Sequence, residues 1–151
     1  MSDPREILRS AQRILLVDWP NRGVPRALVE AGFTVFCASP GRYSVVELVP
    51  EGAEDDDSSD LFPPQEGEVG HLVFRRLNDR PSTVDIVFVY RPEKEHAGIV
   101  ENVVVPVGAK VLWLEPSVGS DAAQQLALDH GLVLVESIDI TVVARQLGDQ
   151  K

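Results

Sequence analysis

The chain has 151 residues, of which 44% are hydrophobic and 25% are charged, and this composition excludes a disordered chain, a coiled coil and a collagen-like fibre. A single cysteine excludes an internal disulfide framework. The 24 acidic and 14 basic side chains give a formal net charge of −10, so we expect no nucleic-acid partner, because Lys and Arg are needed to neutralise a phosphate backbone.

Much of this charge lies in residues 51–70, which hold eight acidic residues and no basic one. Removing them leaves 16 acidic against 14 basic side chains, a net charge of −2, so a phosphorylated ligand is not excluded. The Pro, Gly, Ser and Asp content of this segment predicts a solvated, flexible acidic loop without regular structure. No run of about 18 apolar residues occurs and the start MSDPREILRS is polar, so we expect a cytoplasmic protein with no membrane partner.

Short apolar runs alternate with longer stretches of helical character along the chain. A short apolar run that is rich in branched side chains and does not alternate with polar residues predicts a strand. A glycine that follows one of the longer helical stretches predicts the end of a helix. In chain order we expect a helix over Met1–Ser10, a strand over Arg13–Asp18, a helix from Pro25 to Glu30 ended by Gly32, strands over Phe33–Ala38, His71–Arg76 and Val84–Tyr90, a helix over Pro92–Val105 before Gly108, a strand over Lys110–Leu114, a helix over Ser120–His130 before Gly131, a strand over Leu132–Glu136 and a helix over Ile138–Leu147.

Strands that are apolar on both faces are typical of parallel sheets covered by helices on each side. The alternation therefore predicts a single α/β domain with a three-layer, doubly wound Rossmann-like fold and a mainly parallel sheet of five to six strands. In such a sheet, ligands bind beyond the carboxyl ends of the strands, where the strand order reverses. The corresponding loops are Asp18–Val24, Ser39–Tyr43, Arg91–Glu93 and Glu115–Gly119.

The first of these loops, DWPNRGVPRA, lacks both G-x-G-x-x-G and the P-loop Gly-Lys-Ser/Thr. A helix start still offers backbone N–H groups and a positive dipole end to a phosphate, and Arg22 and Arg26 add charge there. Alternatively, Pro20, Gly23 and Pro25 only shape a turn.

The second loop contains Ser39, Pro40, Gly41 and Arg42. It lacks the acidic residue that holds the ribose hydroxyls of NAD, so NAD is disfavoured. An arginine at this place suits a phosphorylated ribose, as in NADP or coenzyme A. Alternatively, S-P-G-R is a surface turn with an exposed arginine.

Four segments, ILLVD, FTVFCASPGR, VDIVFVYRPEK and GAKVLWLEPSV, resemble the small stand-alone CoA-binding proteins. Their Rossmann-like domain also occurs at the front of the succinyl-CoA synthetase alpha subunit. The resemblance runs from Arg13 to Leu147 and implies coenzyme A or an acyl-CoA as the ligand. It places Pro40 and Arg42 at the adenosine end, Asn21, Arg22 and Gly23 near the pyrophosphate, and Arg91 and Pro92 on the far wall.

Two positions depart from the family pattern. Asp18-Trp19-Pro20 stands where the family usually has Gly-x-Ser or Gly-x-Thr, and Glu115-Pro116 stands where Gln-x-Gly is usual. A bulky Trp19 and a negative Asp18 are unfavourable beside a pyrophosphate. The candidate cofactor-binding residues are Trp19, Asn21, Arg22, Gly23, Arg26, Ser39, Pro40, Arg42, Arg91 and Pro92.

The remaining polar residues suggest no catalytic or metal site. His71, His96 and His130 lack metal-ligand spacing, so we expect ordinary surface roles for them. Cys37 lies in an apolar strand, and Asp85 is interpreted as a structural hydrogen-bond acceptor.

We therefore predict a non-catalytic module that binds coenzyme A or an acyl-CoA. The alternative is a degenerate family member that has lost its ligand, with Trp19 filling the phosphate site, and acts as a protein-interaction domain. A homo-oligomer or another protein partner is compatible with either, because strand edges need covering.

Overall fold

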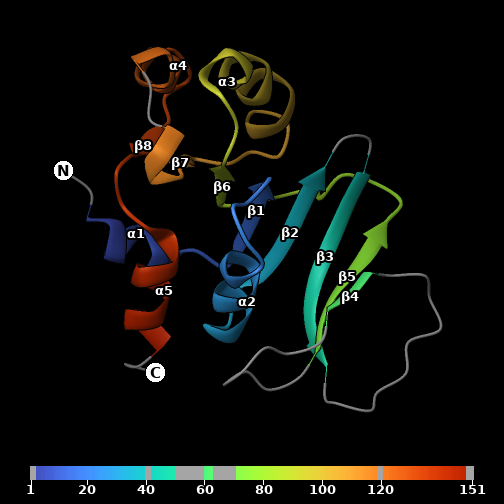
Figure 1. Cartoon of the computed structure of the whole chain (residues 1–151). Coiled ribbons are helices and arrows are strands. Elements are labelled where there is room, and N and C mark those ends of the chain that lie inside the picture. The colour runs from blue at the N-terminus through green and yellow to red at the C-terminus, as the bar shows by residue number, and fades with distance from the viewer. Residues whose placement is uncertain (1–2, 40–41, 50–59, 63–70, 119–120, 149–151) are drawn as a thin grey trace.

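The computed structural model describes residues 3–39, 42–49, 60–62, 71–118 and 121–148. Within these ranges the strands form one sheet in the order β4-β5-β3-β2-β1-β6-β7-β8 (Figure 1). The strands are β1 (Arg13–Val17), β2 (Thr34–Ser39), β3 (Arg42–Val49), β4 (Asp60–Phe62), β5 (His71–Leu77), β6 (Ile86–Val89), β7 (Val111–Leu114) and β8 (Val133–Val135). The helices are α1 (Pro4–Ser10), α2 (Gly23–Glu30), α3 (Glu93–Ile99), the π-helix η1 (Val100–Val104), the 3₁₀ turn η2 (Pro116–Val118), α4 (Asp121–His130) and α5 (Ile140–Gly148).

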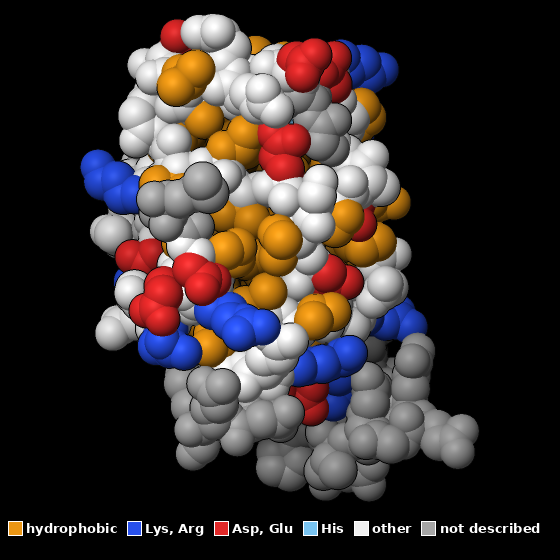
Figure 2. Space-filling view, turned by 90° about the vertical axis from the view of Figure 1, so that its left-hand side faces the viewer, with side chains coloured by type: hydrophobic (Ala, Val, Ile, Leu, Met, Phe, Trp, Pro, Cys, Tyr) orange, Lys and Arg blue, Asp and Glu red, His pale blue; other side chains and the backbone are white. Residues whose placement is uncertain are grey.

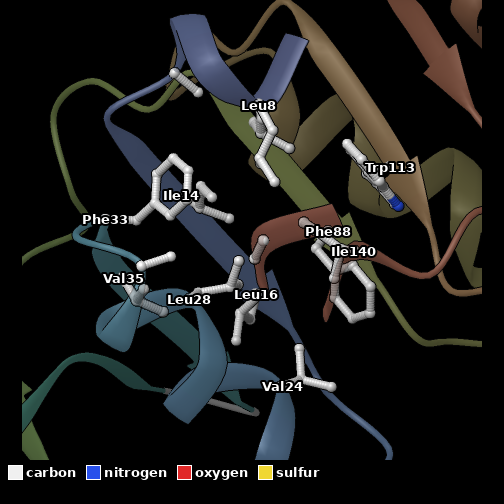
Figure 3. Packing of buried hydrophobic residues seen from close by; sticks show 14 of the residues in the cluster. Leu8, Ile14, Leu16, Val24, Leu28, Phe33, Val35, Phe88, Trp113 and Ile140 are labelled. Atoms are coloured by element: carbon white, nitrogen blue, oxygen red, sulfur yellow. The ribbon is translucent and has the colours of Figure 1, made fainter. Parts of the chain in front are cut away.

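The five strands β2, β1, β6, β7 and β8 are parallel, as the sequence predicts, and helices cover both of their faces. Alternate residues of each strand enter two separate apolar clusters. In β1, for example, Ile14 and Leu16 belong to the cluster with residues of α1, α2 and α5, whereas Leu15 belongs to the cluster with residues of η1 and α4. Figure 3 shows the first cluster, in which Val24 and Leu28 of α2 pack over the sheet. The predicted three-layer α/β fold is therefore confirmed.

The sheet is larger than the expected five to six strands because three antiparallel strands extend it beyond β2. β3 pairs with β2, β5 pairs with β3, and β4 pairs with β5. The sequence predicts β5 but not β3 or β4, and residues 60–62 of β4 fall inside the segment for which no regular structure is expected. The rest of that acidic segment, residues 51–59 and 63–70, lies outside the described residues.

The helix ends follow the predicted glycines. Gly32, Gly108 and Gly131 all have positive φ angles, which glycine adopts without strain. The helix expected over Pro92–Val105 is divided, because an α-helical segment to Ile99 continues as the π-helix η1, in which the Val105 N–H donates to the Val100 carbonyl at 3.0 Å. No helix in the described part of the chain is long and apolar enough to cross a membrane.

Apolar side chains reach the surface near β8, the last strand at one end of the sheet order. Leu128 of α4, Val133 of β8 and Val142 of α5 are exposed, and Figure 2 shows apolar side chains gathered among charged ones on the side of the molecule that carries α1, α5 and β8. The homo-oligomer or protein partner expected from the sequence stays a prediction.

Candidate functional site

The strand order reverses at β1, which lies between β2 and β6. The chain leaves β1 through α2 and enters β2 on one side, while β6 lies on the other side and leads into α3. The segments after β1 and β6 therefore diverge at the carboxyl edge of the sheet, where α/β proteins of this topology bind ligands. We call this place, formed by residues 18–23 and 91–95, the switch point.

An ion pair joins the two segments at the switch point. The Arg91 Nη1 group donates to Asp18 Oδ2 at 3.0 Å, across 73 positions of sequence. The side chains are 39% and 44% exposed, respectively, so both remain accessible to solvent. The pair lies directly beyond the ladder between β1 and β6, which ends with the Tyr90 N–H donating to the Val17 carbonyl at 3.0 Å.

Glu95 holds the other edge of the same guanidinium group. Arg91 Nε donates to Glu95 Oε1 at 3.0 Å and Arg91 Nη2 donates to Glu95 Oε2 at 2.6 Å, a two-pronged contact that fits the planar guanidinium fork. These hydrogen bonds, to Glu95 first and then to Asp18, raise the pKa of Arg91, and the Arg91 contact lowers the pKa of Glu95. Arg91 is thus a fixed cation between two carboxylates.

Asp18 also binds the backbone of its own loop. Its φ angle is +65°, in the left-handed region where Asp is tolerated better than most residues, and its Oδ1 accepts from the Trp19 N–H at 2.9 Å. The Asp18 carboxylate therefore accepts from one backbone amide and one guanidinium group, which are donors that a bound phosphate also uses.

The start of α2 satisfies its own backbone donors. The Gly23 N–H donates to Asn21 Oδ1 at 2.9 Å, the Val24 N–H donates to the Asn21 carbonyl at 3.2 Å, and Pro25 has no N–H. The Arg26 N–H makes the first intrahelical bond, to the Arg22 carbonyl at 3.2 Å. A Cβ on residue 23 would lie 2.7 Å from Asn21 Oδ1, so glycine is what allows this close approach. Asn21 and Gly23, which the family resemblance places near a pyrophosphate, are hydrogen-bonded to each other.

Trp19 packs on the sheet, away from the ion pair. Its ring stacks on Phe74 of β5 with the ring centroids 5.5 Å apart and the planes 12° from parallel. Because β6 and β5 lie on opposite sides of β1 in the sheet, Asp18 and Trp19 leave the end of β1 in opposite directions. Trp19 joins the apolar cluster that includes Val24 and Leu28 of α2.

The other predicted site residues lie at the same edge but differ in accessibility. Arg22 is exposed at the N-cap of α2, whereas the side chain of Arg26 is only 5% exposed and its Nη1 lies 3.9 Å from Glu30 Oε2. Arg42 is exposed and is the first residue of β3, where it pairs with Ser39 across the antiparallel ladder. Arg42 therefore lies in a strand and not in the expected loop, and the 39–42 segment links two paired strands. Pro92 is exposed at the N-cap of α3, and Pro40 and Gly41 lie outside the described residues.

Other polar residues have structural roles. Asp85 Oδ2 accepts from the backbone N–H groups of Gln12 and Arg13, both at 2.9 Å, as the sequence predicts. Burial raises the pKa of the Cys37 thiol. The surface role expected for His96 is wrong, because this side chain is buried and its Nε2 lies 2.8 Å from the Arg91 carbonyl, next to the ion pair. Within the described residues, no cluster of three or more His, Cys, Asp and Glu side chains could hold a metal ion.

Comparison with known proteins gives the family of the chain and supports its fold. Residues 17–142 match the model of a family described as the CoA binding domain. Among solved structures, the chain is similar to Prb, a protein redesigned for binding (21% identity over 98% of this chain and 92% of that chain, TM-score 0.63). It is also similar to a protein from Thermus thermophilus (20% identity, 95% of each chain, TM-score 0.57) and to a hypothetical protein from Pyrococcus horikoshii OT3 (22% identity, 95% of this chain and 89% of that chain, TM-score 0.57). At this level of identity the structures support the fold alone.

Proposed function

Because the chain belongs to the family of CoA-binding domains, we propose that it is a non-catalytic module that binds coenzyme A or an acyl-CoA at the carboxyl ends of the strands. The observation that carries the proposal is the position of Arg91 at the switch point. Its side chain is 39% exposed, and Nη1 donates to the carboxylate of Asp18, whose side chain is 44% exposed. A phosphate of the ligand can replace that carboxylate, because guanidinium groups bind phosphate and carboxylate with similar geometry.

Arg42 supports a second contact with the same ligand. It is exposed at the carboxyl end of β2, and β2 is the neighbour of β1 in the sheet. Coenzyme A carries a phosphate on its ribose, and we assign that phosphate to Arg42 and the pyrophosphate to Arg91. Glu95 keeps its two bonds to Arg91 in this arrangement and holds the guanidinium group in place.

The satisfied start of α2 favours a second candidate, a protein-interaction domain without a ligand. The Gly23 and Val24 N–H groups bond to Asn21, and Asp18 occupies Arg91, so the usual phosphate donors of this topology have internal partners. In this candidate the fold is kept for a protein partner and the switch point is a structural ion pair.

Calorimetric titration of the full chain with coenzyme A, acetyl-CoA and dephospho-CoA separates the two candidates. We expect the wild type to bind coenzyme A. Arg91→Lys should bind it about tenfold or more weakly, because the two-edged guanidinium contact is lost. Arg42→Ala should lower the affinity for coenzyme A but not the affinity for dephospho-CoA. Arg145→Ala, which removes an exposed arginine from α5, is the matched control and should bind as the wild type does. No binding of any of the three compounds at millimolar concentration would reject the ligand-binding module and favour the interaction domain.

A further inference from the structure

We infer that Asp18 acts as a built-in anionic competitor, so that a phosphate binds the switch point only by displacing the Asp18 carboxylate from Arg91. The inference rests on the proposed function for the identity of the ligand, but not for the competition itself. Its basis is that one carboxylate from this chain occupies the donors at the end of β1.

The first step is the division of the Arg91 guanidinium group between two partners. Glu95 takes Nε and Nη2, at 3.0 and 2.6 Å, and Asp18 takes Nη1 at 3.0 Å. Glu95 lies in the first turn of α3, only four residues after Arg91, so this contact stays within one short segment of the chain. The contact with Asp18 instead joins two segments that are far apart in the sequence. The Nη1 side of the guanidinium group is therefore the side to which an incoming anion can bind.

The second step concerns the backbone. Asp18 reaches Arg91 with a φ angle of +65°, and the same carboxylate accepts the Trp19 N–H at 2.9 Å. A phosphate that approaches Arg91 from this side competes for Nη1, which it cannot bind while the Asp18 carboxylate accepts from that nitrogen. Because Asp18 is 44% exposed, its carboxylate can move into solvent without a desolvation cost.

Asp18→Asn tests the competition with little change of shape. Asparagine keeps the Oδ1 acceptor for the Trp19 N–H and tolerates the left-handed backbone, but it removes the negative charge beside Arg91. Asp129→Asn is the matched control, because Asp129 is an exposed carboxylate near the C-terminal end of α4, its Oδ1 accepts from Gln125 Nε2 at 2.8 Å, and it is not part of the switch point.

The first measurement is a calorimetric titration with coenzyme A. We expect Asp18→Asn to bind about three- to tenfold more tightly than the wild type, and Asp129→Asn to bind equally to the wild type. If the wild type binds coenzyme A and Asp18→Asn binds it equally or more weakly, the competition is wrong while the proposed function stands.

The second measurement uses inorganic pyrophosphate, so it does not depend on the proposed ligand. Arg91 is modified with phenylglyoxal, the modified peptide is quantified by mass spectrometry, and the pyrophosphate concentration that protects half of Arg91 is determined. We expect a threefold or greater decrease of this concentration in Asp18→Asn. Equal half-protecting pyrophosphate concentrations in the two proteins, or no protection in either, would overturn the inference. A lower half-protecting concentration in Asp18→Asn, without coenzyme A binding, would reject the proposed ligand alone.

Discussion

Substitution of Trp19 tests whether this residue stabilises the sheet or contributes to the ligand site. The half-buried indole stacks on Phe74, with 5.5 Å between ring centroids, and Phe74 is itself buried. If half of the surface of a typical aromatic side chain is buried here, Trp19→Ala loses about 100 Å² of buried apolar surface. This loss corresponds to about 2.5 kcal/mol of the free energy of unfolding. The stacked geometry adds about 0.5–1.5 kcal/mol. We therefore expect the free energy of unfolding to fall by about 3–4 kcal/mol and the melting temperature by about 6–16 °C.

Urea unfolding followed by circular dichroism at 222 nm measures this loss without depending on tryptophan fluorescence. Trp19→Phe keeps an aromatic ring in the stack and should recover most of the stability. A double-mutant cycle with Phe74→Ala isolates the ring–ring contact, for which we expect a coupling energy of about 0.5–1.5 kcal/mol. A loss below about 0.5 kcal/mol in Trp19→Ala, combined with weaker coenzyme A binding, would refute the packing argument and return Trp19 to the ligand site.

Two further predictions concern the residues around the switch point. Asn21→Ala removes the acceptor for the Gly23 N–H, so the free energy of unfolding should fall by about 0.5–1.5 kcal/mol and the Gly23 amide should exchange with solvent faster; an unchanged exchange rate would contradict this hydrogen bond. Because Arg91 lowers the pKa of Glu95, their pair stabilises the fold above the ordinary pKa of a glutamate, about 4.3, and this contribution is lost as the pH falls through the lowered value. A carbon-13 NMR titration of the Glu95 carboxyl group should have its midpoint below that ordinary value, and a midpoint at or above it would disprove the pairing.

The parallel part of the fold could be predicted because its signal is local. A strand such as β6, Ile86–Val89, is buried on both faces, and four consecutive apolar residues between polar loops suffice to identify it. β3 has no such signature. Its residues Arg42–Val49 alternate irregularly, so neither its hairpin with β2 nor its pairing with β5 has a clear signal in the sequence. β4 is only three residues long and lies within an acidic segment, whose composition predicts a loop.

The candidate site was predicted in part for a related reason. The loops after parallel strands lie at one edge of a sheet, so the sequence predicts that Asp18–Val24 and Arg91–Glu93 both lie at the edge where ligands bind. The contact between Arg91 and Glu95 also had a local signal, since the residues are four positions apart at the start of a helix. The contact with Asp18 spans 73 positions and needs a positive φ angle, and neither feature can be derived from residue type alone.

Asp18 and Trp19 together explain how the family's fold can persist with a changed first loop. The glycine-containing turn that the family resemblance leads one to expect would leave backbone donors open; here two consecutive side chains use the end of β1 differently. Asp18 satisfies the charge of Arg91 and the Trp19 N–H, whereas the Trp19 ring covers the sheet over Phe74. Because the two side chains point to opposite sides of β1 and share no side-chain partner, their effects should be separable: Asp18 controls anion affinity and Trp19 controls stability. We therefore expect the exchange of one carboxylate at Arg91 to matter more for anion binding at the switch point than the overall acidity of the chain.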